Sequence, residues 1–126
     1  MRWYQYIRAD YPNIPTVIRD MKAELLNMRR YSRDWRRYLD GRYGSVRILG
    51  RDYPIGQALY RIDRAAFGRL CRAETEIEGE RVAELLEKAR PGSIVEPCFG
   101  CWILVTDETD AGKGKTGRKK RKEEKK

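Results

Sequence analysis

The sequence predicts an α+β fold: a long N-terminal amphipathic helix, followed by a small unit of two helices and a short antiparallel sheet. Apolar residues recur at alternating steps of three and four over residues 15–39, which is the period of a helix with one buried face. Later in the chain, short β-rich runs are bounded by glycine and proline, as is typical of strands. The 126 residues allow one domain, residues 1–110, and a tail, residues 111–126. Within the domain we expect a basic helical part, residues 1–42, and an α+β part, residues 43–110.

The helical part is predicted to hold two helices. Residues 3–9 form a short one, which a bend at residues 10–13 separates from the next because proline cannot continue a helix. The long helix begins near Pro15, whose missing N–H is not needed in the first turn, and Gly41 ends it. Its apolar stripe consists of Ile18, Met21, Leu25, Met28, Trp35 and Leu39. We expect this stripe to be buried, within the chain or in a homodimer formed through residues 15–39.

The α+β part begins with a strand predicted at residues 45–49, between glycines. Asp52 and Pro54 then open a helix. The apolar face of that helix is Ile55, Leu59, Ile62, Ala66 and Leu70. In residues 73–79, glutamates alternate with other residues, which fits an exposed edge strand or a loop.

A helix and a hairpin are the last predicted elements. Residues 81–89 form the helix, which ends at Arg90-Pro91-Gly92. Residues 94–95 and 102–105 are β-rich, and proline and glycine occur in the segment between them. This pattern predicts an antiparallel hairpin.

Basic residues are concentrated at the two ends of the chain. The formal net charge is +9. The tail contains nine Lys or Arg against two Glu, and residues 1–42 contain ten basic against five acidic residues. Because the tail has no aromatic and no large aliphatic residue to bury, we expect it to be disordered. Such a surplus of positive charge indicates an anionic partner.

The arginines of the long helix are the first candidates for binding that partner. They lie off the apolar stripe and are Arg29, Arg30, Arg33, Arg36 and Arg37. Their spacing places most of them along one side of the helix, where guanidinium groups can follow a phosphate backbone. The tail adds Lys119, Lys120, Arg121 and Lys122. The alternative is a solvated helix face, in which Asp34 and Asp40 pair with the arginines.

The chain has three cysteines and no histidine. The absence of histidine excludes Ser-His-Asp and Cys-His catalysis and the common histidine metal sites. Cys98 and Cys101 have the spacing of zinc and redox motifs, but only Cys71 is left as a third zinc ligand, and a strand follows where a redox motif needs a helix. We therefore expect reduced thiols, no cofactor and no enzymatic activity, with a zinc or redox protein as an alternative.

No segment of the sequence predicts attachment to a membrane. The longest apolar run, residues 98–105, is too short to span a bilayer, and the first residues lack the apolar stretch of a signal peptide. An odd number of cysteines in a chain without such a signal fits a reducing compartment. We expect a cytoplasmic protein with no membrane partner.

One segment resembles a known family. Residues 9–25 read Ala-Asp-Tyr-Pro-Asn-Ile-Pro-Thr-Val-Ile-Arg-Asp-Met-Lys-Ala-Glu-Leu, a Tyr-Pro bend before a heptad-like helix. This segment resembles the start of small phage-encoded late-transcription regulators of the ArpU/RinA type. The resemblance implies a phage or prophage origin, and hence the host cytoplasm. Those regulators continue into a helix-turn-helix, whereas this chain continues into glycine-flanked strands, so no DNA-reading helix is assigned.

Three hypotheses follow for the function. The first is a non-enzymatic, phage-type protein that binds nucleic acid or a nucleoprotein machine through the arginine-rich helix and the basic tail. The second is an inhibitor or adaptor that acts on a host nucleic-acid enzyme, such as a defence nuclease, by using the same arginines. The third is the zinc or redox protein built on the cysteines.

Overall fold

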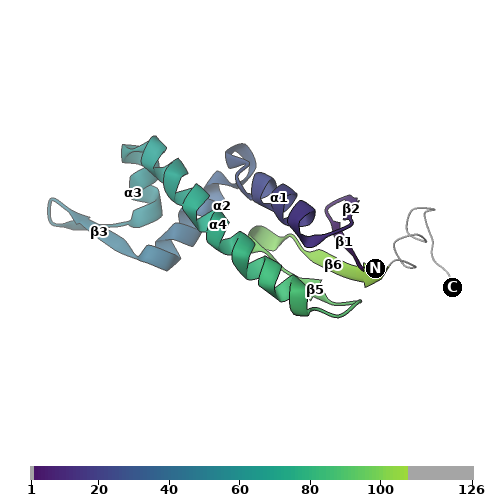
Figure 1. Cartoon of the computed structure of the whole chain (residues 1–126). Coiled ribbons are helices and arrows are strands. Elements are labelled where there is room, and N and C mark those ends of the chain that lie inside the picture. The colour runs from purple at the N-terminus through teal and green to yellow at the C-terminus, as the bar shows by residue number, and fades with distance from the viewer. Residues whose placement is uncertain (1, 108–126) are drawn as a thin grey trace. The chain divides into compact units, whose positions relative to one another are not determined.

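The computed structural model describes residues 2–107 and has an α+β fold (Figure 1). It contains four α-helices, a four-stranded antiparallel sheet and a separate two-stranded hairpin. The chain divides into two compact units. One unit comprises the described residues up to Met21 together with those from Glu78 onward, and the other is Lys22–Ile77. The predicted disorder of the tail, residues 111–126, lies outside the described residues.

The first unit is built on the four-stranded sheet, whose order is β2-β1-β6-β5. Its strands are β1 (Arg2–Tyr6), β2 (Ala9–Tyr11), β5 (Ile94–Val95) and β6 (Ile103–Asp107). All three pairings are antiparallel, and β1 and β6 lie side by side over their whole length (Figure 1). The buried apolar side chains of this unit are Tyr4, Tyr6, Val17, Ile18, Met21, Val82, Leu86, Val95, Ile103 and Val105.

The short helix predicted at residues 3–9 is wrong, because this segment forms β1 and the start of β2. Tyr4 and Tyr6 are only 6% and 2% exposed, so the buried positions recur at the period of two that a strand requires. Aromatic side chains also favour strands. The turn that joins the two strands passes through Ile7, whose φ of 57° is left-handed.

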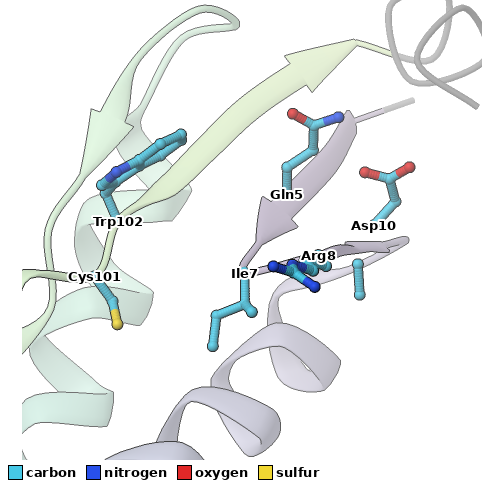
Figure 2. A pocket seen from close by; sticks show the side chains of 7 residues that line it. Gln5, Ile7, Arg8, Asp10, Cys101 and Trp102 are labelled. Carbon is cyan, nitrogen blue, oxygen red and sulfur yellow. The ribbon is translucent and has the colours of Figure 1, made fainter. Parts of the chain in front are cut away.

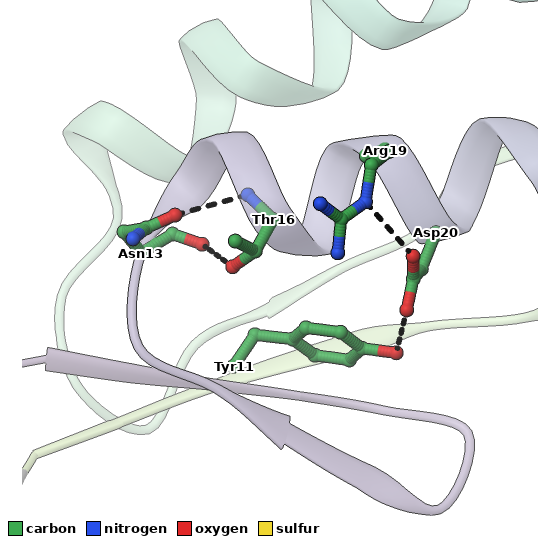
Figure 3. A network of polar contacts seen from close by, with 5 residues as sticks. All are labelled: Tyr11, Asn13, Thr16, Arg19 and Asp20. Carbon is green, nitrogen blue, oxygen red and sulfur yellow. Dashed lines mark hydrogen bonds and ion pairs between the residues drawn. The ribbon is translucent and has the colours of Figure 1, made fainter.

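Helix α1 (Ile14–Leu25) follows β2 and begins at an asparagine cap (Figure 3). The side-chain oxygen of Asn13 accepts a hydrogen bond of 2.9 Å from the backbone N–H of Thr16. Asp20 lies one turn after Thr16 and accepts a hydrogen bond of 2.7 Å from the Tyr11 hydroxyl. Arg19 pairs with the other oxygen of the Asp20 carboxylate at 3.3 Å. This network joins α1 to strand β2.

The second unit contains α2 (Met28–Tyr43), α3 (Ile55–Ile62) and the first part of α4 (Arg64–Lys88). The buried Trp35 donates from its indole nitrogen to the carbonyl oxygen of Leu25 at 2.7 Å. Other buried apolar side chains of this unit are Leu25, Tyr31, Leu39, Ala58, Phe67 and Cys71. The hairpin of β3 (Ser45–Ile48) and β4 (Arg51–Pro54) confirms the strand predicted at residues 45–49.

The single long helix predicted over residues 15–39 is wrong, because the helix is interrupted between the end of α1 at Leu25 and the start of α2 at Met28. Asn27 caps α2, and its side-chain oxygen accepts from the N–H of Arg30 at 3.3 Å. The apolar stripe is nevertheless buried at Ile18, Met21, Leu25, Trp35 and Leu39, and half-buried at Met28. The homodimer through this segment stays a prediction.

The predicted helix boundaries after residue 50 also need correction. Residues 51–54 form strand β4, so the helix begins only at Ile55, and it ends at Ile62 instead of reaching Leu70. Residues 73–79, expected as a strand or loop, lie inside α4. The same helix contains nearly all of the predicted helix at 81–89. The buried Glu74, Thr75 and Glu78 occupy inward positions of α4, so polar residues hid its helical period.

The predicted C-terminal hairpin is confirmed as β5 and β6, in which Val95 lies opposite Ile103. A short 3-10 turn, Cys98–Gly100, joins them and places Phe99 at a left-handed φ of 69°. Among residues 2–107, no helix is both long and apolar enough to cross a membrane.

Candidate nucleic-acid interface

The arginines of α2 lie on its solvent side because the opposite side is packed. Tyr31, Trp35 and Leu39 recur at steps of four and are buried. The intervening arginines are therefore directed outward: Arg36 is half-buried, and the exposed ones are Arg29, Arg30, Arg33 and Arg37. The structure thus gathers all five predicted arginines on one helix. The tail residues Lys119, Lys120, Arg121 and Lys122 lie outside the described part of the chain.

Only one of these five arginines is paired with a carboxylate in the described residues. Arg30 forms an ion pair of 3.3 Å with Glu24, which also accepts from the hydroxyl of Tyr31 at 3.1 Å. Arg30 therefore fits the alternative of a salt-bridged helix face. For Arg29, Arg33, Arg36 and Arg37, no ion pair joins them to a carboxylate within residues 2–107.

Asp40, one of the two expected partners of the arginines, has another role. Its Oδ1 accepts hydrogen bonds from the backbone N–H groups of Gly56 at 2.8 Å and Gln57 at 3.3 Å. These groups belong to the first turn of α3, where a negative charge also meets the positive end of the helix dipole. Asp40 thus fastens α3 to α2 and leaves the neighbouring arginines uncompensated.

Two guanidinium groups lie over one aromatic ring of α3. The guanidinium carbon of Arg36 lies 4.3 Å from the ring centre of Tyr60, and that of Arg64 lies 3.8 Å from the same centre. Each arginine is also held by one backbone hydrogen bond, from Arg36 Nε to the carbonyl of Ser32 and from Arg64 Nε to the carbonyl of Tyr60. The ring itself packs edge-on against Phe67. Arg36, Tyr60 and Arg64 therefore form a fixed cationic cluster.

A hollow of about 460 Å³ adjoins this cluster in the second unit. Its polar lining comes from Arg29 and Ser32 of α2, Tyr60 of α3 and Arg64 of α4. Met28, Phe67 and Gly68 complete the lining. The lining contains two arginines and no carboxylate, so the hollow favours an anion.

The sequence reasoning missed Tyr60 and Arg64. Their spacing of four residues would place them on one face if a single helix ran through them. The sequence carried no signal that this face meets the arginines of α2. That meeting depends on the packing of α3 against α2.

The sixth arginine of α2, Arg42, pairs with a buried carboxylate. It forms an ion pair of 2.7 Å with Glu74, whose carboxylate is 1% exposed and also accepts from the hydroxyl of Tyr43. The hydrogen bond to Glu74 raises the pKa of Tyr43, and the same carboxylate raises the pKa of Arg42. This ion pair compensates the buried charge of Glu74, so the charge of Arg42 adds little to the positive surface of α2.

The three cysteines do not gather with other potential metal ligands in the described residues. No group of three or more His, Cys, Asp or Glu side chains is placed to hold a metal ion within residues 2–107. Cys71 is buried in α4, and burial raises the pKa of its thiol to about 12. All three cysteines are unbridged, and Cys98 and Cys101 are half-buried at the 3-10 turn.

Glu78 explains how the turn at Cys98 is held. The carboxylate is 4% exposed and receives two hydrogen bonds from Arg81, at 2.7 and 2.8 Å. Glu78 also accepts from the backbone N–H of Cys98 at 3.0 Å. Burial, followed by the charge of Glu78, raises the pKa of the Cys98 thiol to about 12. A thiol of this pKa is a poor nucleophile, so the contact has a structural role.

A second hollow, of about 490 Å³, lies in the sheet unit (Figure 2). Its lining includes Ile7 and Trp102, which are 58% and 50% exposed. Arg8 and Asp10 bring opposite charges to the same hollow. The lining therefore selects neither an anion nor a cation.

No protein-family model, curated protein or solved structure shows a significant match to this chain. The phage origin implied by residues 9–25 stays a prediction.

Proposed function

We propose that the protein binds nucleic acid, without catalysing a reaction, through the basic surface of α2. Its members are Arg29, Arg33, Arg36 and Arg37. The observation that carries the proposal is that none of these arginines is paired with a carboxylate in the described residues, although Asp40 lies on the same helix. Uncompensated guanidinium groups on a helix suit a polymer of phosphates, which arginine binds with two parallel hydrogen bonds.

Binding through these arginines should depend steeply on salt. Each phosphate contact releases condensed counterions, so four contacts to a duplex predict a roughly 100-fold loss of affinity between about 50 and 200 mM salt. Contacts to phosphates carry no sequence information, so we expect little dependence on base sequence.

The test replaces Arg33 and Arg37, which are exposed and have no ion pair in residues 2–107, by glutamate. R33E/R37E should abolish binding of a fluorescent oligonucleotide in a polarisation assay. Its unfolding midpoint should stay close to that of the wild type, because exposed charges contribute little to stability. The matched control is R8E/R90E, which changes the net charge equally at two exposed arginines of the sheet unit.

Two outcomes contradict the proposal. Equal oligonucleotide affinity for R33E/R37E and R8E/R90E would mean that net charge, and not this surface, attracts the polymer. Equal affinity of the wild type for polyglutamate and for an oligonucleotide of the same charge would favour the inhibitor or adaptor hypothesis, because an acidic protein presents carboxylates.

A further inference from the structure

We propose that the hollow beside Tyr60 binds one phosphate group of the nucleic acid, with Arg64 and Arg29 as its ligands and Tyr60 as the residue that positions the guanidinium group of Arg64. This inference rests on the proposed function and extends it to residues outside the predicted arginine set. The phosphate site itself can be tested without a polymer.

The electrostatics of the cluster favour an anion. Arg36 and Arg64 both lie close to the centre of the Tyr60 ring, so the two positive charges are held near each other. Attraction to the ring offsets part of their repulsion. No ion pair within residues 2–107 brings a carboxylate to either arginine, and Arg29 adds a third positive charge at the edge of the hollow. A bound phosphate would relieve this repulsion.

The hydrogen-bonding groups that remain also suit a phosphate. The Nε atoms of Arg36 and Arg64 are used by backbone carbonyls, at 3.4 and 2.9 Å. Within residues 2–107, no acceptor receives a hydrogen bond from their terminal nitrogens. The hydroxyl of Ser32 lines the same hollow as a further donor. The hollow is thus lined by side chains that carry donors, Arg29, Ser32 and Arg64, which suits the several acceptor oxygens of a phosphate.

The cluster is better suited to a phosphate than to a base. Guanidinium groups occupy space over the Tyr60 ring at 3.8 and 4.3 Å, which is the space that a stacked base would need. A guanidinium group over an aromatic ring can still donate from its terminal nitrogens to a phosphate. Tyr60 therefore acts through the arginines and serves as a positioning residue.

The first experiment measures thermal unfolding of the full chain in sodium phosphate and in sodium chloride of equal ionic strength. Phosphate stabilises many proteins non-specifically, so the relevant quantity is the difference between variants. The wild type and R61Q, an exposed arginine of α3 that does not line the hollow, should gain a few degrees more than R64Q. An equal gain for R64Q and the wild type would overturn the proposal.

The second experiment measures oligonucleotide affinity with and without a 5′-phosphate. R64Q should weaken binding about tenfold, and R61Q should not. Y60F should bind like the wild type because it keeps the ring, whereas Y60L should lose affinity as R64Q does. A loss confined to the 5′-phosphorylated strand assigns the site to a terminal phosphate, and a loss with both strands assigns it to an internal phosphodiester.

The outcomes separate the two proposals. If R33E/R37E abolishes oligonucleotide binding and R64Q leaves it unchanged, the phosphate site is refuted and the proposed function stands. If the wild type binds no oligonucleotide, but phosphate raises the unfolding temperature of the wild type more than that of R64Q, the proposed function is refuted and the anion site stands.

Discussion

Gly56→Ala tests the packing of α3 on α2, on which the cationic cluster depends. A Cβ atom built on Gly56 would lie 2.2 Å from the carbonyl oxygen of Arg36 and 2.9 Å from its carbonyl carbon. Ordinary contacts of a Cβ atom begin at 3.4 Å, so the two helices would have to move apart by about 1 Å at this point. Because both obstructing atoms belong to the backbone, no change of side-chain rotamer can relieve the clash.

The expected loss of stability follows from two costs and one gain. Overpacking of a well-packed contact costs about 1–3 kcal/mol. The same Cβ would lie 2.9 Å from the Asp40 oxygen that caps α3, and a lost cap costs about 1 kcal/mol more. Alanine gains up to about 1 kcal/mol over glycine as a helix former, and less in a first turn such as that of Gly56. We therefore expect the free energy of unfolding to fall by about 1–3 kcal/mol.

The assay is urea unfolding of the full chain, followed by circular dichroism. Gly41→Ala is the control, because Gly41 lies in the last turn of α2 and its Cβ would meet nothing within 4 Å. This control should be neutral or stabilising by up to about 1 kcal/mol. Equal midpoints for the two variants would refute the close approach of α3 to the backbone of Arg36, and with it the geometry of the cluster.

Two further predictions concern titrating groups in the sheet unit. Glu78→Gln removes the charge that helps to raise the pKa of Cys98, so iodoacetamide should alkylate the thiol faster at about pH 8. Arg81→Gln removes a charge that lowers this pKa, so it should slow the same reaction. Peptide mass spectrometry measures both rates. Burial, together with the hydrogen bond to Asp20, raises the pKa of Tyr11 from 10.0 to about 12. The unfolded chain therefore releases this proton first, so the stabilisation is complete below pH 10 and is lost between pH 10 and about 12. Tyr11→Phe should show a smaller loss of urea midpoint from pH 9 to 11 than the wild type, and an equal loss would contradict the role of this hydroxyl.

Elements with a regular apolar pattern could be predicted from the sequence, and α4 shows why others could not. The hairpin of β5 and β6 follows from short β-rich runs around a proline and a glycine, which are local signals. In α4, the inward positions at Glu74 and Glu78 are glutamates, whose burial depends on Arg42 and Arg81. The compensation of these buried charges depends on the tertiary structure and is not visible in the sequence, so the alternating glutamates looked like a solvated strand or loop.

The break between α1 and α2 was missed for a related reason. The apolar stripe continues at helical spacing across the break, and five of its six members are buried as expected. A capping asparagine at residue 27 was the local signal of a new helix start. Periodicity reports which residues face the core, and it reports less about whether one helix or two carries them.

The basic character of α2 depends on the fold as much as on composition. The helix contains six arginines and two aspartates, a mixture that can form a neutralised surface. Folding assigns Arg42 to the buried Glu74, Arg30 to Glu24, and Asp40 to the first turn of α3. The arginines left without a carboxylate in the described residues lie on the solvent side, and α3 brings Tyr60 to one of them. In the described residues Asp40 bonds the first turn of α3 and pairs with none of these arginines, so the contact that fastens α3 also leaves positive the surface on which we propose nucleic acid binds.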